Sequence, residues 1–596
     1  MRTAHLPSIS GLLTSSSTDN LRSEVPCGFR RFKAMEHPPL SPVHTTRVKG
    51  LASGPVSWLY DTHAGLRNHF VARWIFLRAL AVIYFSAFFP LLFQIEGLNG
   101  PRGILPARQF LLALRAEPGL IRYWYAPTLF WLSSGSHMMM AVVWAGLIAS
   151  VAAFFNLWPR LSLFVCFVCF LSFVTSAQAF SSYQSDSMLL EAGFLVLFFA
   201  PSGVLPGWGL ASPPSRVSYF LLQWEWFRIY FESGLVKLLS GDTEWRDFTA
   251  MDEYYQNGPL PTWIGWYVEH LPHWFHAATV AGTLGMELAV VWMLFLPKRL
   301  RLICFCIVTP WEIGVILTAN YTFLNYIVLA LGFLLLDDHS VRGLLPMRLR
   351  CSLPELPQVV EERDNQSLSI LNPPGEAVEA VTPAPRRRGD YFKIARLSVA
   401  ALMLTWIAYA TTFELLRMAS PDLPLPSAPV VALEPFRIAN QYGLFAVMTR
   451  GRYEIEFQGS NDGQRWTPYV FRYKPQALDK APGVYAPYQP RFEWNLWFAS
   501  LGDWQQNDLV PLTEQRLLEN DSDVLFLFQG NPFAQAPPRY VRAVLWQYWF
   551  TSMEEKRRTG NWWKRNLMGL YAPVLTRLPD GQFSVIEWPD ELPNHD

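Results

Sequence analysis

One segment decides the fold of this chain, residues 224–252, which read WEWFRIYFESGLVKLLSGDTEWRDFTAMD. It begins as an apolar, aromatic helix long enough to enter a bilayer, yet it carries Glu232 and Lys237. A charged side chain in hydrocarbon costs several kcal/mol unless it is paired, hydrated or able to reach the membrane surface, so Lys237 is a candidate functional residue. The alternative is a structural lysine that extends to the interface and pairs with Asp242.

The composition of the whole chain indicates a polytopic membrane protein. Of its 596 residues, 51% are hydrophobic and only 16% are charged, whereas soluble proteins average about 25% charged residues. The formal net charge of +1 provides no global field that would attract nucleic acid. The six cysteines are too few for a disulfide scaffold, and Cys166 and Cys169 lie in an apolar run that lacks the context of a redox motif.

Nine apolar stretches are candidate transmembrane spans by length and hydropathy. They predict a helical membrane domain over residues 52–352, with about eight spans, and a last span at residues 394–416. Lys and Arg are concentrated before the first span, after the sixth and before the last, which places these loops in the cytoplasm if the number of spans is odd. The nine stretches are residues 71–93, 130–155, 161–179, 188–205, 218–239, 275–296, 302–317, 321–336 and 394–416.

Further regions flank the predicted spans. Residues 1–51 are rich in Ser, Pro and Arg and have no apolar signal core, so we expect a disordered extension. Residues 353–393 are rich in Pro and Glu, which predicts a flexible cytoplasmic linker. Residues 417–570 contain short alternating runs, including RYEIEFQGS and RWTPYVFRY on either side of an Asp-Gly turn. They predict an all-β, sandwich-like domain on the extracytoplasmic side, followed by a tail at residues 571–596.

Polar side chains recur within the predicted spans and predict a polar interior of the helix bundle. Glu191 needs either a partner such as Lys237 or Arg228 or a raised pKa. The alternative is an acid near a helix N-terminus that the helix dipole favours. The histidines of LPHWFH have no carboxylate at a standard ligand spacing, so we expect no metal site. The predicted membrane polar cluster consists of Asp186, Glu191, Lys237, Glu287, Asn320 and Asn325.

In the C-terminal region, the stretch YQPRFEWNLWFASL combines Arg491 with Trp494 and Trp497. Arg and Trp are frequent anchors of protein–protein contacts, so these residues are candidates for binding a protein partner. They are equally typical of a domain core with one satisfied charge pair, and we favour a core position for Trp494.

Several long motifs, taken in order, resemble those of the lipase maturation factor family. The resemblance implies a polytopic membrane protein, resident in the endoplasmic reticulum in animals, that assists the folding and assembly of secreted lipases. The chain would be a maturation factor and not a lipase, in keeping with the lack of a G-x-S-x-G motif in its C-terminal sequence. The motifs are GLNGPRGILPA, FSSYQSDSMLLEAGFL, FRIYFESGLVKLLSGDTEWRDFTAMDEYYQNGPLP, LPHWFH, ANYTFLNY, YKPQALDKAPGVYAPYQPRFEWNLWF and NPFAQAPPRYVRAVLWQYWF.

The expected function is therefore that of a chaperone-like maturation factor. Its clients would be secreted lipases or other exported proteins, with Arg491, Trp494 and Trp497 as client-binding candidates. The bilayer is the other expected partner, and we expect neither nucleic acid nor a cofactor. The membrane would be that of the endoplasmic reticulum in a eukaryote and the inner membrane in a bacterium, with the C-terminal domain in the lumen or periplasm.

A second, weaker resemblance involves Gly234, Lys237 and Trp245, which are similar to a catalytic segment of vitamin K-dependent carboxylases. In that family the lysine acts as a base towards a quinol. The resemblance implies an alternative of a different class, a quinone-dependent membrane enzyme with Lys237 as the base. The other candidate residues of that site are Glu191, Arg246 and Asp252.

Overall fold

The computed structural model describes residues 54–115, 119–181, 183–344 and 388–590. The predicted extension at residues 1–51 and most of the predicted linker lie outside these ranges. Helix α18 (Arg388–Ala419) begins before residue 393, so the predicted linker runs too far at its C-terminal end.

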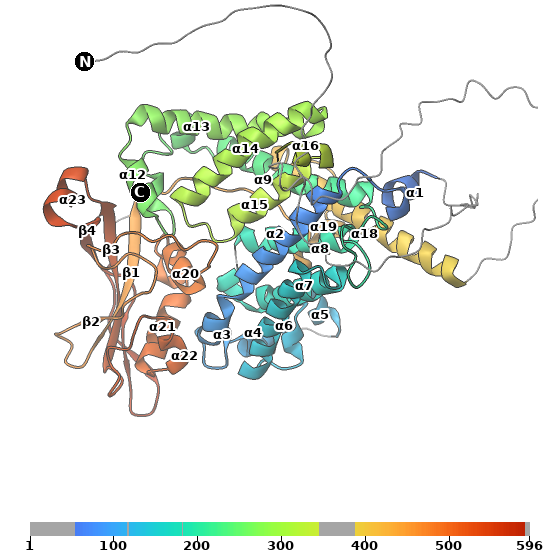
Figure 1. Ribbon diagram of the computed structural model, residues 1–596. Helices are drawn as coiled ribbons and strands as arrows, with labels where there is room; N and C mark the ends of the chain where they lie inside the picture. The colour runs from blue at the N-terminus through green and yellow to red at the C-terminus, as the bar shows by residue number, and fades with distance from the viewer. Residues whose placement is uncertain (1–53, 116–118, 182, 345–387, 591–596) are drawn as a thin grey trace, which may run out of the picture. The chain divides into compact units, whose positions relative to one another are not determined.

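Six helices in the described part of the chain are long and apolar enough to cross a membrane, and a bent helix pair raises the number to at most seven. Each of the six matches one of the nine predicted spans, because a run of about twenty apolar residues is both the sequence signal and the physical requirement. They are α2 (Phe70–Phe88), α6 (Ser136–Phe154), α7 (Pro159–Ser176), α13 (His273–Leu288) with η4 (Val290–Phe295), α14 (Lys298–Thr318) and most of α18 (Figure 1).

The other three predicted spans form shorter or more polar helices. α8 (Gln184–Phe199) has 16 residues, and the helical segment that begins with α15 (Leu324–Gly332) bends by 112° into α16 (Asp338–Leu344). α9 (Arg216–Leu239) is long enough, with 24 residues, but buries four charged side chains, those of Glu225, Arg228, Glu232 and Lys237. α9 nevertheless packs against α8, α13, α15 and α18, so its charged groups must find partners within the protein.

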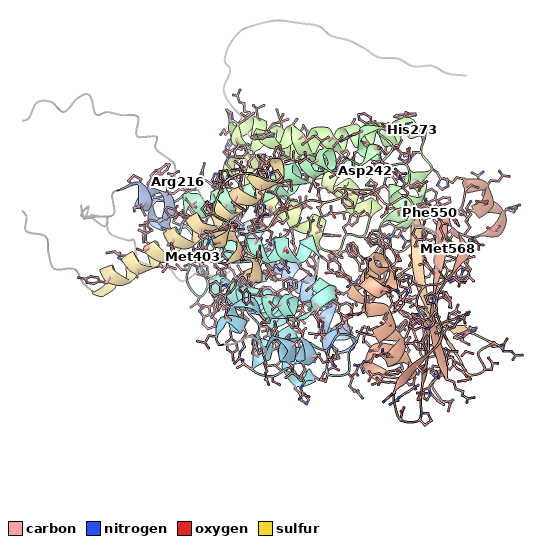
Figure 2. The ribbon with its side chains drawn as sticks, turned by 180° about the vertical axis from the view of Figure 1, so that it is seen from behind. Arg216, Asp242, His273, Met403, Phe550 and Met568 are labelled. Carbon is pink, nitrogen blue, oxygen red and sulfur yellow. The ribbon has the colours of Figure 1, made fainter. Side chains whose placement is uncertain are left out.

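The helix bundle has two distinct ends. At the end where α2 begins, which we call the α2 end, the carboxylate of Asp338 accepts the backbone N–H groups of Phe70 and Val71 at 2.9 and 2.7 Å. The C-terminal domain meets the bundle at the opposite end, which we call the domain end. α9 runs from one to the other, as the positions of Arg216 and Asp242 in Figure 2 show.

The C-terminal domain is built on one antiparallel sheet of six strands, in the order β2-β1-β3-β5-β6, with β4 also paired to β3. Helices α20 (Arg491–Ala499), α21 (Leu509–Leu518) and α22 (Ser522–Leu525) lie between the sheet and the membrane helices (Figure 1). No second sheet is found in the described residues of this domain, so helices take the place of the second layer of the predicted sandwich. The strands are β1 (Arg452–Ser460), β2 (Thr467–Pro468), β3 (Tyr540–Phe550), β4 (Trp563–Leu570), β5 (Val574–Arg577) and β6 (Phe583–Glu587). Since β5 and β6 complete the sheet, the domain extends into the predicted tail.

Alternation along β1 separates an apolar face from a charged one. Ile455 and Phe457 are fully buried on the helix-covered face, where the ring of Phe457 stacks on that of Phe492 in α20 at a centroid distance of 6.4 Å. Glu454 and Glu456 alternate with them and are buried on the other face. The sheet therefore needs ion-pair partners for its second face.

The predicted Asp-Gly hairpin is confirmed, although its second strand is short. Gly463 has a φ of +72°, a conformation that suits glycine, and the Asp462 carboxylate accepts the N–H groups of Gln464 and Arg465 at 2.9 and 2.8 Å. β2 ends at Pro468, which has no N–H to continue the ladder.

Candidate functional site

Buried polar contacts join the membrane helices to the C-terminal domain and to the segment that precedes it. We call this set of contacts the polar seam. Its charged side chains are at most 10% exposed, so each depends on its partner instead of on water. The seam consists of the ion pairs Asp186–Arg491, Glu191–Arg228, Lys237–Glu287 and Arg452–Glu454, together with Asn320, Asn440, Tyr442 and Leu444, which bond to the opposite side.

The first pair of the polar seam links α8 to α9. Glu191 pairs with Arg228, one of the two partners predicted for it, and both side chains are buried. The other oxygen of Glu191 accepts the N–H of Asn440 at 3.1 Å and the hydroxyl of Tyr442 at 2.9 Å. Tyr442 also donates its N–H to Glu232 at 2.6 Å. The segment before β1 thus supplies donors that the two helices lack.

The second pair links α9 to α13. Lys237 Nζ lies 2.9 Å from both carboxylate oxygens of Glu287 and donates to the carbonyl of Leu444 at 3.0 Å. Gly234 permits this approach, because a Cβ at that position would lie 2.8 Å from the Cβ of Glu287. Lys237 is 1% exposed, so the alternative in which it reaches the membrane surface is wrong. Asp242, its predicted partner there, instead accepts the backbone N–H of Met448 at 2.7 Å.

The third pair links α8 to α20. Arg491 donates through Nη1 and Nη2 to the two oxygens of Asp186, each at 2.8 Å, and Nη1 also donates to the carbonyl of Phe180 at 2.8 Å. Both charged side chains have no exposed surface. Trp494 and Trp497 are also buried, at 6% and 8% exposure. The three predicted client-binding residues therefore offer no open surface, because the helix that carries them is packed between the sheet and the membrane helices.

The remaining members of the predicted membrane polar cluster lie apart from these pairs. Asn320 accepts the N–H groups of Tyr485 and Ala486 at 2.7 and 3.0 Å, and so bonds to the C-terminal domain. Asn325 donates to Glu312 at 2.6 Å, within the helix bundle. The predicted residues therefore form several separate groups and not one cluster.

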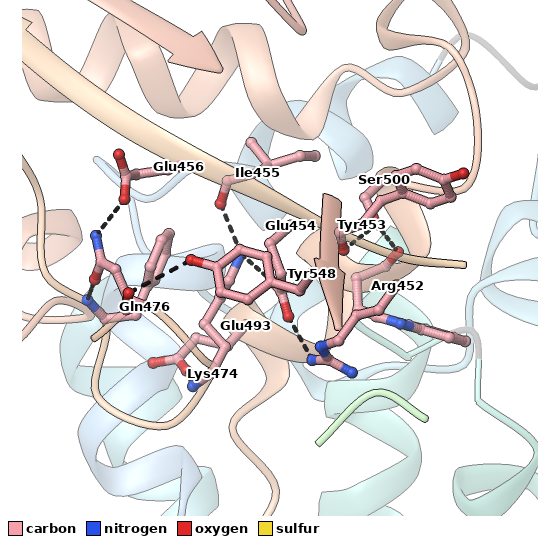
Figure 3. Close-up of polar contacts among 12 residues, drawn as sticks. Arg452, Tyr453, Glu454, Ile455, Glu456, Lys474, Gln476, Glu493, Ser500 and Tyr548 are labelled. Carbon is pink, nitrogen blue, oxygen red and sulfur yellow. Dashed lines mark hydrogen bonds and ion pairs between the residues drawn. The ribbon is translucent and has the colours of Figure 1, made fainter. Parts of the chain in front are cut away.

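A further anchor of the polar seam was not predicted. Arg452 of β1 pairs with Glu454, and its Nη1 donates to the carbonyls of Gln256 and Gly258, at 2.9 and 2.5 Å, at the end of the short helix α11 (Tyr254–Asn257). Lys474 Nζ completes the group at 2.7 Å from Glu454 (Figure 3). The alternation of RYEIEFQGS indicated a charged face, but nothing in the sequence showed that a segment nearly two hundred residues earlier covers it.

Glu493 lies on α20 in the C-terminal domain, two residues after Arg491. Its carboxylate accepts the backbone N–H groups of Arg472, Tyr473 and Lys474 at 2.9, 2.8 and 2.5 Å. These bonds favour the ionised form, but burial outweighs them and raises the pKa of Glu493 to about 7. Its charge therefore changes within the physiological range.

The residues of the enzymatic alternative do not converge on one site. Arg246 is exposed at the end of the short helix α10 (Thr243–Arg246), and Asp252 bonds to the exposed side chain of His273 at 3.0 Å. Lys237 is occupied by Glu287, and Glu191 by Arg228. In the described ranges we find no group of three or more His, Cys, Asp or Glu residues that could hold a metal ion. Nothing in this arrangement supports a base poised next to a quinone.

Comparison with known proteins gives one consistent result. Residues 71–343 match the lipase maturation factor transmembrane domain, and residues 438–573 match the lipase maturation factor C-terminal domain. The chain is 31% identical to lipase maturation factor 1 of Bos taurus, with 87% of this chain and 91% of the relative covered. It is 31% identical to lipase maturation factor 2 of Gallus gallus, with 85% and 81% covered. No solved structure matches the chain. The chain belongs to the lipase maturation factor family.

Proposed function

We propose that this protein is a membrane-embedded maturation factor that assists the folding or assembly of secreted lipases or related exported proteins. The observation that carries the proposal is that the family relationship covers both the helical and the C-terminal domain. The names of the relatives state this role for them, and the extent of the match supports it here. The polar seam adds that the two domains work as one unit, because separating them would break the buried ion pair Asp186–Arg491 and the hydrogen bonds that Asn320, Tyr442 and Leu444 make across it.

We propose further that the C-terminal domain lies on the lumenal or periplasmic side. Cationic residues are concentrated next to the α2 end of the bundle, and such residues favour the cytoplasm. The first turn of α14 alone contributes three. The loop after α9, at the domain end, is mainly acidic instead. The cations near the α2 end are Arg67, Arg73, Arg160, Arg216, Lys298, Arg299, Arg301 and Arg342.

A client-binding surface is best supplied by α12 (Trp263–Glu269) and its neighbour α23 (Met553–Thr559). Trp263 and Tyr267 of α12 are 45% and 47% exposed, and the ring of Tyr267 lies 6.3 Å from that of Trp562. Lys556 of α23 stands 3.9 Å from the centre of the Trp562 ring. Exposed aromatic rings beside a cation are typical of protein-binding surfaces, so this patch takes the role first assigned to Arg491, Trp494 and Trp497.

The function can be tested in cells that lack their own members of the family. Expression of this chain should restore the activity of a secreted lipase, and the full-length chain should co-precipitate with the immature lipase. Replacing Trp263 and Tyr267 together with serine should lower both readouts at an equal protein level. Trp144→Ser, at a 52% exposed position on the apolar helix α6, is the matched control and should leave both unchanged. Failure of the unmodified chain to change lipase activity would reject the proposal.

The orientation needs a separate test. Cysteine introduced at Arg557 in α23 should react with a membrane-impermeant maleimide added to the lumenal or periplasmic side. Cysteine at Arg299, in the first turn of α14, should react only from the cytoplasmic side. The reverse pattern would place the C-terminal domain in the cytoplasm and would exclude direct contact with exported clients.

A further inference from the structure

A cavity of about 320 Å³ lies where the end of α2 and the following helix α3 (Leu91–Asn99) meet the C-terminal domain. Eight of its lining residues are aromatic or aliphatic, and only three are polar. It has the size and apolar character of a small ligand site. The lining residues are Phe89, Phe93, Gln94, Arg472, Tyr473, Tyr488, Pro490, Phe492, Glu493, Phe526 and Leu527.

An exposed aromatic stripe connects this cavity to the membrane-spanning part of α2. Val82 and Phe85 of α2, Phe89 in the turn after it and Phe93 of α3 follow one another at spacings of three or four residues and are 39–49% exposed. The ring centroids of Phe85 and Phe89 are 5.8 Å apart, and those of Phe89 and Phe93 are 5.4 Å apart. Since Phe85 lies within a candidate span and Phe93 lines the cavity, the stripe forms a continuous apolar path from the bilayer into it.

The polar groups in the wall are already bonded. Gln94 donates to the carbonyl of Gln489 at 3.0 Å and accepts the N–H of Arg491 at 2.8 Å. Glu493 takes up the backbone N–H groups of Arg472 and Tyr473. A polypeptide in this cavity would therefore find few partners for its own backbone, whereas a hydrocarbon chain needs none.

One cation, Arg472, lines the cavity on its domain side, and a second cation bonds to it. Arg472 is exposed, donates to the carbonyl of Phe526 at 2.9 Å and lies 5.3 Å from the centre of the Phe526 ring. Lys480 is also exposed and donates to the carbonyl of Arg472 at 3.3 Å. An anionic group that entered beside Phe526 would meet positive charge there.

From these observations we propose that the cavity binds an anionic membrane glycerophospholipid. One acyl chain enters sideways from the bilayer along Phe85, Phe89 and Phe93, and the phosphate of the head group rests against Arg472. This inference depends on α2 being a membrane span and not on the proposed maturation function. Its failure would leave that function untouched.

The test is photo-crosslinking of the full-length chain in nanodiscs of phosphatidylcholine. A small fraction of the lipid is a phosphatidylglycerol with a diazirine on one acyl chain, and labelled residues are mapped by mass spectrometry. The label should fall on Phe89, Phe93 or Phe526. Arg472→Gln should reduce it about tenfold, since a hydrogen bond between charged groups is worth that factor or more.

Matched variants keep the result interpretable. Arg108→Gln removes another exposed cation and should change nothing, while Phe526→Ser should lower labelling without loss of folding because that side chain is 54% exposed. Phe155, which is 69% exposed at the α2 end, reports general contact with lipid. Four outcomes would each overturn the proposal. The label could fall equally on Phe155 and on the cavity, or labelling could be unchanged by Arg472→Gln and Phe526→Ser. A phosphatidylcholine probe could label the cavity equally well, or a bound polypeptide could be recovered from it.

Discussion

Replacing Arg491 with methionine removes the cation from the ion pair that joins α20 to α8, while preserving much of the side-chain volume. Arg491 makes three hydrogen bonds of 2.8 Å, two to Asp186 and one to the carbonyl of Phe180. Without it, the Asp186 carboxylate has no exposed surface and no cationic partner at this position. The substitution therefore leaves a buried charge uncompensated.

The expected loss follows from this geometry. Removing one partner of a buried ion pair costs about 3–5 kcal/mol, and we take about 4 kcal/mol because both Nη1 and Nη2 of Arg491 are engaged. That corresponds to nearly a thousandfold change in the folding equilibrium constant. The double variant with Asp186→Leu should recover most of the loss, since an apolar pair can replace a buried ion pair at little cost.

The free energy of unfolding can be measured by SDS titration of the purified chain in mixed micelles, with tryptophan fluorescence as the signal. The matched control is Arg102→Met, because Arg102 forms an ion pair with Asp523 at 3.0 Å but is 63% exposed. Its loss should be below about 1 kcal/mol. If Arg491→Met cost no more than Arg102→Met, or if the double variant were no more stable than the single one, the reasoning about the polar seam would be refuted.

Three further predictions concern other parts of the chain. Burial raises the pKa of Glu493 to about 7, so its stabilising effect is fully present below its ordinary pKa of 4.5 and is lost as the pH rises through 7. The loss amounts to at most about 3 kcal/mol, and Glu493→Gln should flatten the unfolding free energy over this range; an unchanged slope would contradict this origin. Lys237→Met should cost about 3 kcal/mol by isolating Glu287, and adding Glu287→Leu should restore most of it in the same titration; failure of the rescue would count against a structural role. Gly97→Ala places a Cβ 2.4 Å from the backbone oxygen of Asp523 and should cost about 2 kcal/mol, whereas Gly285→Ala, with no atom within 4 Å, should be nearly neutral; equal losses would show that the α3–α22 contact is not tight.

The sequence predicted those features that depend on local signals. Long apolar runs identified the six helices of the described ranges that are long and apolar enough to span a membrane, and the Asp462–Gly463 turn identified the first hairpin. The charges of α9 were recognised as needing partners, and Arg228 was correctly named as one candidate for Glu191. These inferences succeed because the length of an apolar run, the alternation of side chains along a strand and the residues of a turn are all local properties of the sequence.

The sequence could not reveal features that depend on distant partners. The sequence left Arg491 open between an anchor of protein contacts and a core charge pair, because its partner Asp186 lies 305 residues away in the chain. The stretch RFEWNLWFA, rich in aromatic residues, suited a sandwich core, yet it forms helix α20 because its neighbours are a sheet on one side and membrane helices on the other. Asn440 and Tyr442 carried no local signal at all, since their role arises only from contact with α8 and α9.

The donors supplied by Asn440 and Tyr442 have a consequence for the order of biosynthesis. Glu191 is translated 249 residues before Asn440, and Glu232 is translated 210 residues before Tyr442. At ordinary rates of translation, these carboxylates wait on the order of ten seconds or longer for their donors. The buried carboxylates of α8 and α9 therefore lack these hydrogen-bond donors until residue 442 has been synthesised. The packing of the two helices can be completed only after that point.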